Sequence, residues 1–276
     1  MRKTCNWKFL IGIFALLGAG CSPASQVAAP GQNALENTPF FAWMEGYIAL
    51  AEGEEWSLML TSFRPEGTKD PALEQASAVE LVFEDDFCPI EVIDAEVVEP
   101  GAPAQQDGMV FDGLSLTLSA AQQGTAACEE VILHQPDGSE VHRKIGRLVF
   151  DVGPVEPETT ALDTYPGPAV ATSSDSLVYT WDKEDKNAVI TAIQYGEDFV
   201  ITSAEQIADS EPEANGLPAS GRIALDAYDA PYLYIKAKIT VQDGAGTHTE
   251  YARGCYCGTD FDADDIAASR EHNAAS

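Results

Sequence analysis

The chain has 276 residues, of which 45 are acidic and 15 are basic, and its formal net charge is −30. Such an excess of negative charge repels phosphate backbones and anionic lipid headgroups, so it excludes nucleic acid as a natural partner. After the first 20 residues no stretch is apolar for long enough to span a bilayer as a helix.

The first 20 residues carry the three parts of a secretory signal. A basic start without acids is followed by a short apolar run and then by small residues suited to a cleavage site. These parts are Arg2, Lys3 and Lys8, then Phe9–Leu17, then Gly18-Ala19-Gly20. All acidic residues come later in the chain, so removal of this segment leaves a mature protein that is more acidic still.

The cysteine after this signal makes the stretch resemble the bacterial lipoproteins, whose signal ends in a lipobox. Here the cysteine is Cys21, although Gly18 stands where the family has a branched apolar residue and Leu17 comes one place earlier. The resemblance implies cleavage before Cys21, a diacylglyceryl thioether on its sulfur and acylation of the new amine. Several acyl chains would anchor the protein stably. Ordinary secretion with a spare thiol is the alternative.

The residue after the cysteine bears on localisation. In Gram-negative lipoproteins an aspartate there retains the protein in the inner membrane, and this chain has Ser22. The resemblance therefore implies an outer-membrane lipoprotein on either the periplasmic or the surface face. Residues 21–39 are small, polar and interrupted by prolines, so we expect a flexible tether that reaches about 20–25 Å.

Residues 40–152 show the alternation of β-strands. We expect strands at Phe41–Leu50, Trp56–Phe63, Ala78–Glu84, Ile90–Val98 and around Leu114–Leu118. Asp70 followed by Pro71 predicts the start of one helical turn. The turn Pro136-Asp137-Gly138 predicts a hairpin between Glu130–His134 and Glu140–Phe150.

Residues 153–174 are rich in proline and poor in apolar residues, and we interpret them as a linker or as a long loop ordered on one domain. Residues 175–258 return to strand patterns. The strongest is Tyr232–Val241, where Leu233, Ile235 and alternate residues up to Val241 would face a core. The fold class expected is mainly β, with two small antiparallel sandwiches of Ig-like architecture. Residues 259–276 would form an acidic tail with a short helix.

The cysteines that remain in the mature chain are expected to pair, because the compartment is oxidising. We predict a structural disulfide between Cys88 and Cys128, which share the first domain, and a local disulfide between Cys255 and Cys257. A CxC bridge closes a small ring that is easily reduced, so a thiol-redox role for Cys255 and Cys257 is an alternative.

The acidic tail offers one candidate metal site. Asp260, Asp262, Asp264 and Glu271 occupy positions 1, 3, 5 and 12 of a calcium loop, although Asp265 stands where that loop needs glycine. The competing interpretation is that Asp262 or Asp264 caps a short helix. A calcium-stabilised adhesion or structural module is therefore an alternative function.

Three further groups are weaker candidates for binding. His134 and His142 could face each other across the predicted hairpin, and His142 to Arg147 form a basic patch that could dock a carboxylate or phosphate. Tyr232 and Tyr234 would share one strand face, which could stack on sugar rings or anchor a protein partner if exposed.

No catalytic motif stands out in the sequence, including the nucleophile elbow, the zinc-protease helix, the phosphate-binding loop and the dinucleotide fingerprint. We therefore expect a lipid-anchored cell-envelope protein that works as a non-catalytic binding or structural module, with a protein or a polysaccharide as partner. No cofactor is expected apart from the possible calcium ion.

Overall fold

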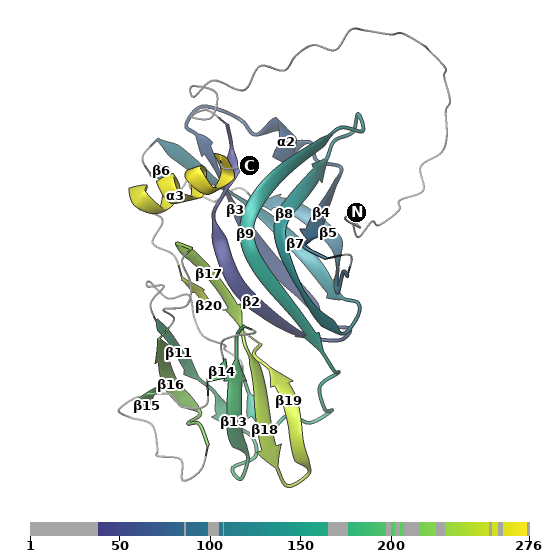
Figure 1. Cartoon of the computed structure of the whole chain (residues 1–276), viewed down its shortest axis with the longest axis vertical. Coiled ribbons are helices and arrows are strands. Elements are labelled where there is room, and N and C mark those ends of the chain that lie inside the picture. The colour runs from purple at the N-terminus through teal and green to yellow at the C-terminus, as the bar shows by residue number, and fades with distance from the viewer. Residues whose placement is uncertain are drawn as a thin grey trace, which may run out of the picture.

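The computed structural model describes residues 38–85, 87–98, 105–106, 108–164, 176–196, 200–201, 205–206, 216–224, 230–253, 256–258 and 262–274. Within these residues, no helix is long and apolar enough to cross a membrane. Strands dominate, and Figure 1 shows a larger sandwich above smaller sheets. The mainly β fold expected from the alternating sequence patterns is confirmed.

Two sheets enclose the larger core. The five-stranded sheet runs in the order β1-β3-β7-β5, with β6 beside β7, and consists of β1 (Phe40–Phe41), β3 (Glu55–Pro65), β5 (Ile90–Val98), β6 (Gln105–Gln106) and β7 (Met109–Ala120). The six-stranded sheet runs in the order β20-β17-β2-β9-β8-β4 and consists of β2 (Met44–Ala51), β4 (Ala78–Phe83), β8 (Gly124–His134), β9 (Glu140–Gly153), β17 (Tyr232–Lys236) and β20 (Tyr256–Gly258).

The remaining strands form the smaller sheets. One has four strands, β14 (Val200–Ile201), β13 (Val189–Gln194), β18 (Lys238–Asp243) and β19 (Gly246–Tyr251). A second has three, β11 (Ser176–Thr180), β16 (Ser220–Ala224) and β15 (Glu205–Gln206), and a third pairs β10 (Leu162–Asp163) with β12 (Asp182–Lys183). The two described helices are α2 (Pro71–Glu74) and α3 (Ala263–Ala274).

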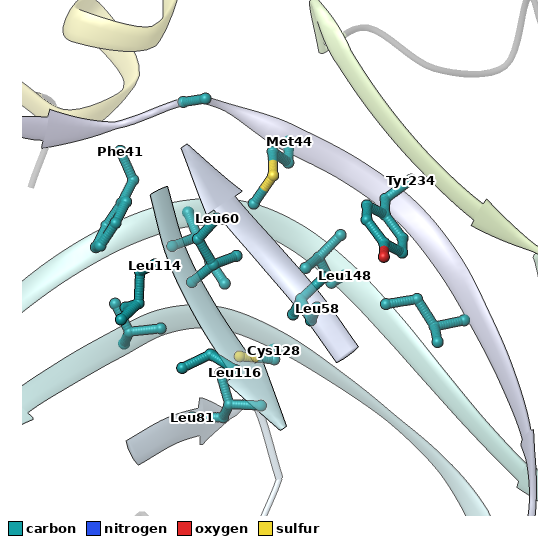
Figure 2. Packing of buried hydrophobic residues seen from close by; sticks show 14 of the residues in the cluster. Phe41, Met44, Leu58, Leu60, Leu81, Leu114, Leu116, Cys128, Leu148 and Tyr234 are labelled. Carbon is teal, nitrogen blue, oxygen red and sulfur yellow. The ribbon is translucent and has the colours of Figure 1, made fainter. Parts of the chain in front are cut away.

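Strand β2 is buried on both faces because it separates two cores. Met44 and Ile48 point into the larger core, which Figure 2 shows between the two sheets of the sandwich. Tyr47 and Ala49 point the other way, into a second core shared with the smaller sheets. Successive side chains of a strand alternate between faces, so a strand buried on both faces is mostly apolar, as β2 is apart from Glu45. The six-stranded sheet therefore joins the two halves of the chain.

The predicted strand Tyr232–Val241 is two strands in two different sheets. Its first part, β17, pairs in parallel with β2, and after Ala237 the chain continues as β18 beside β13 and β19. Parallel pairing recurs between β2 and β9. The sandwich is thus mixed where antiparallel sheets were expected, and the β17 pairing crosses the domain boundary expected at residues 153–174.

The described part of the expected linker is hydrogen-bonded to β19. The carboxylate of Glu250 accepts hydrogen bonds from the backbone N–H groups of Ala161 and Leu162, at 2.6 and 3.1 Å. The carboxylate of Glu156 accepts one from the N–H of Tyr251, at 2.9 Å. Up to Thr164 this segment is therefore held against β19, and it includes the short strand β10. Residues 165–175 lie outside the described part.

Several local predictions are confirmed. Asp70 caps α2 with Pro71 at its first position, and β8 and β9 form the hairpin around the turn at Asp137. The strand expected at Ala78–Glu84 is β4, and its Leu81 and Phe83 face the larger core.

Candidate functional site

The residues of the predicted anchor lie outside the described part of the chain. This holds for Cys21, and the same is true of Cys255 and Asp260. Cys257 is described only as part of the backbone of β20. The lipid site and the Cys255–Cys257 bridge therefore remain predictions.

The predicted bridge between Cys88 and Cys128 is wrong, because Cys128 carries a free thiol. Cys128 lies on the inner face of β8, fully buried among the apolar side chains of the larger core. Its Sγ donates to the carbonyl oxygen of Glu130, at 3.5 Å. Burial raises the pKa of this thiol to about 12, so Cys128 stays protonated and unreactive in the folded chain.

The prediction of a calcium loop in the tail is also wrong. From Ala263 the tail is the helix α3, and Asp262 caps it: its Oδ1 accepts from the N–H groups of Asp264 and Asp265, at 2.9 and 3.0 Å. Asp264 and Glu271 then lie about 10 Å apart along the helix axis, whereas a calcium loop brings its oxygens around one point. The capping interpretation of Asp262 is confirmed.

Helix α3 packs against the sandwich through an aromatic contact. The ring of His272 stacks on Trp43, with the ring centroids 5.0 Å apart. Partial burial, with a smaller contribution from the positive charge of Lys144, lowers the pKa of His272. The tail is thus part of the folded body.

The predicted basic patch is divided between the two faces of β9. Arg143 points inward, where its guanidinium holds both oxygens of Asp70 at 2.5 and 2.6 Å. Arg147 points outward and pairs with Glu84 at 3.1 Å. Plain alternation would put Arg143 and Arg147, four residues apart, on one face. A register shift against β8 at Gly146, which has a positive φ, turns Arg147 outward, so no continuous basic surface forms there.

The predicted tyrosine row is buried. Tyr232 and Tyr234 have exposed fractions of 7% and 5% and belong to the larger core. The opposite face of β17 carries Leu233 and Ile235 into the second core. This strand therefore offers no aromatic surface to a sugar or a protein partner.

A different arrangement gathers on the outer face of β4, β8 and β9. Its centre is Glu140, which lies directly opposite His134 and two residues before His142. Glu140 Oε1 lies 3.5 Å from His134 Nδ1, and Glu140 Oε2 lies 3.7 Å from His142 Nε2. The other ring nitrogens are held by Glu80, at 2.9 Å from His134 Nε2, and by Glu130, at 2.6 Å from His142 Nδ1. We call these five residues the histidine–glutamate cluster.

The outer face beside the cluster is also acidic. Glu129 lies next to Glu84, and partial burial together with a hydrogen bond to Glu84 raises the pKa of Glu129. Arg147 and Lys144 offset part of this negative charge. The cluster thus belongs to a surface where carboxylates outnumber cations.

The sequence already contained part of the signal for this cluster. The hairpin was predicted, and its register alone places Glu140 and His142 on one face with His134. Glu80 comes from β4, which is distant in sequence, and only the sheet order β9-β8-β4 brings it to the same face.

Comparison with known proteins gives only remote similarities. No family model and no curated protein matches the chain. Among solved structures, a non-cellulosomal cohesin from the archaeon Archaeoglobus fulgidus is 10% identical, covers 42% of this chain and 91% of its own, and superposes with a TM-score of 0.20. The titin Ig tandem domains A164-A165 are 11% identical and cover 80% of this chain and 97% of their own, with a TM-score of 0.18.

A third match has the same character. The fibronectin(III)-like modules of Clostridium thermocellum CbhA are 9% identical and cover 80% of this chain and 94% of their own, with a TM-score of 0.19. Such low scores carry no argument about function, which must come from the residues themselves.

Proposed function

We propose that this chain is a lipid-anchored protein of a bacterial cell envelope whose folded part binds a partner and performs no catalysis. The observation that carries the proposal is the signal-like segment that ends at Cys21. It is followed by the proline-interrupted residues 22–39, and the first described strand begins at Phe40. This order supports an anchor, a spacer and a folded module.

The polar contacts of the fold support the non-catalytic part of the proposal. Buried charges of the described residues are engaged in ion pairs that hold strands together. Arg143 is paired with Asp70, and the ammonium of Lys236 lies 3.1 Å from Glu54. The Lys238 ammonium contacts Asp151, which also accepts from the Tyr47 hydroxyl. The Lys238–Asp151 pair joins β18 to β9, and the Arg143–Asp70 pair joins β9 to the start of α2, as expected of a structural module.

The anchor is tested by expressing the full chain with Cys21→Ala in a Gram-negative host supplied with radioactive palmitate. We expect the wild-type chain to incorporate label and to sediment with membranes, and the variant to be unlabelled and soluble. Cys5→Ala, inside the signal, is the matched control and should behave as the wild type. A Cys21→Ala chain that stays labelled in the membrane fraction would overturn the anchor.

Two further results bear on the proposal. Ser22→Asp should move the labelled protein from the outer to the inner membrane, because the lipoprotein resemblance assigns sorting to this position. Hydrolytic turnover of an envelope substrate that is lost with a single Asp or His substitution would overturn the non-catalytic role.

A further inference from the structure

We propose that the histidine–glutamate cluster binds one divalent transition-metal ion such as Zn²⁺, with His134 Nδ1, His142 Nε2 and the carboxylate of Glu140 as ligands. Imidazole nitrogens and a carboxylate are a donor set that suits zinc and its neighbours in the periodic table. Three protein ligands leave a fourth position for water or for a group from a partner.

The backbone places the three ligands on one face. Glu140 and His142 are two residues apart on β9, so both project outward, and His134 on β8 is the direct partner of Glu140. Neighbouring rows of a sheet bring such side chains within reach of one ion. No ligand depends on a loop, so the sheet fixes the three attachment points.

Both histidines already face the carboxylate of Glu140. Bonds of about 2.0–2.1 Å in tetrahedral geometry separate two ligand atoms by about 3.3 Å. The two Glu140 oxygens lie 3.5 and 3.7 Å from the ring nitrogens that they face. In the described part of the chain no group of three or more His, Cys, Asp or Glu side chains is placed to hold a metal ion as it stands. The His134, Glu140 and His142 side chains must therefore rotate towards one another when the ion enters.

The second ring nitrogen of each histidine contacts a carboxylate, as is usual for histidines that bind metal ions. Histidine ligands usually donate their other N–H to a carboxylate, which fixes the ring and raises its basicity. Glu80 does this for His134 and Glu130 for His142, at 2.9 and 2.6 Å. Glu80 is nearly buried, whereas the ligands remain reachable, with side-chain exposures of 27% for His134, 51% for Glu140 and 52% for His142.

Another histidine supplies a contrast within the same chain. His248 also lies between two carboxylates, at 2.7 Å from Glu250 and 3.9 Å from Asp243. Glu250 is already occupied by two backbone N–H groups, and the three-residue group contains a single imidazole. His248 is therefore the matched control for a histidine that is paired but does not ligate.

The test is calorimetric titration of the purified, EDTA-treated full chain with ZnCl₂. We expect one Zn²⁺ per chain, at least tenfold weaker binding in His142→Gln and Glu140→Gln, and a roughly tenfold loss in Glu130→Gln through the outer carboxylate. His248→Gln and the double variant Cys255→Ser/Cys257→Ser should bind as the wild type does. Glu140 is half exposed, so its substitution tests the site even if a histidine variant folds poorly.

Melting curves distinguish a metal site from a structural ion-pair network. Zn²⁺ should raise the Tm of the wild type and of His248→Gln, but not that of Glu140→Gln. Equal zinc affinity in the wild type and in His142→Gln would overturn the proposal, as would loss of binding in the cysteine variant alone. Absence of any binding at 100 µM Zn²⁺ would overturn it without affecting the proposed anchor, which rests on Cys21.

Discussion

Gly46 on β2 lies directly opposite Tyr234 on β17, so close that a Cβ on the glycine would lie 1.9 Å from the tyrosine carbonyl oxygen. Only glycine allows this approach, because the obstructing atom is backbone and cannot rotate away. The contact is the place where a strand from the second half of the chain joins the sheet of the first half.

Gly46→Ala is therefore expected to force β2 and β17 apart and to lower the free energy of unfolding by about 1–3 kcal/mol. Urea denaturation followed by tryptophan fluorescence measures the loss. Gly244→Ala is the control, because nothing lies within 4 Å of a Cβ at that glycine. It should change the stability by less than about 0.5 kcal/mol. Equal stability of the two variants would contradict the close approach.

The pair of Arg143 with Asp70 should stabilise the fold far more than an exposed pair. Arg143→Leu leaves the Asp70 carboxylate buried without its cation, which typically costs about 3–5 kcal/mol. Arg147→Leu removes the exposed partner of Glu84 from the same strand and should cost less than about 1 kcal/mol. Denaturant titration of both variants checks the difference. Similar losses of unfolding free energy in both variants would show that the buried Arg143–Asp70 pair stabilises the fold no more than the exposed pair does.

Cys128 should resist thiol reagents for as long as the chain is folded. At about pH 8 a thiol whose pKa is raised to about 12 is almost entirely protonated, and the thiolate is the reactive form. Iodoacetamide labelling followed by peptide mass spectrometry should find Cys128 unmodified in buffer and fully modified in urea without reductant. A peptide pair joined through Cys88 and Cys128 would contradict the free thiol.

Lys236 should make the stability depend on pH in the alkaline range. Its ammonium is fully buried, and this burial lowers its pKa from the ordinary 10.5, although Glu54 opposes the shift. Between the lowered pKa and 10.5 the unfolded chain binds more protons than the folded chain. The free energy of unfolding therefore rises as the pH increases through that range.

Lys236→Met is expected to flatten this dependence, because it removes the group that titrates. Denaturant titrations between about pH 8 and pH 10 measure the slope, below the range in which exposed tyrosines ionise. Glu54→Gln should steepen it, since the lysine then loses the carboxylate that favours its charge. Identical slopes in the wild type and Lys236→Met would show that burial does not perturb this lysine.

Features that depend on neighbouring residues could be predicted from the sequence. The cap at Asp70, the turn at Asp137 and the apolar alternation of Leu114–Leu118 each depend on a few adjacent residues, and all are confirmed. The capping role of Asp262 belongs to the same class. Local hydrogen bonding and strand period decide these features wherever the segment lies in the fold.

The tertiary structure decided which faces meet. Alternation in Tyr232–Val241 predicted one buried face, but β17 is buried on both faces because it lies between two cores. The tertiary structure also decided the state of Cys128. A disulfide partner was inferred from the compartment, but the thiol is free and is buried by the packing of two sheets. In the histidine–glutamate cluster the predicted hairpin contains four of the five residues, and the sheet order adds Glu80. By itself the sequence predicts the leader and determined the local elements, because their signals lie in consecutive residues. Which elements pack together, and which charges they bring together, depended on contacts between residues up to 232 positions apart, which no local pattern records.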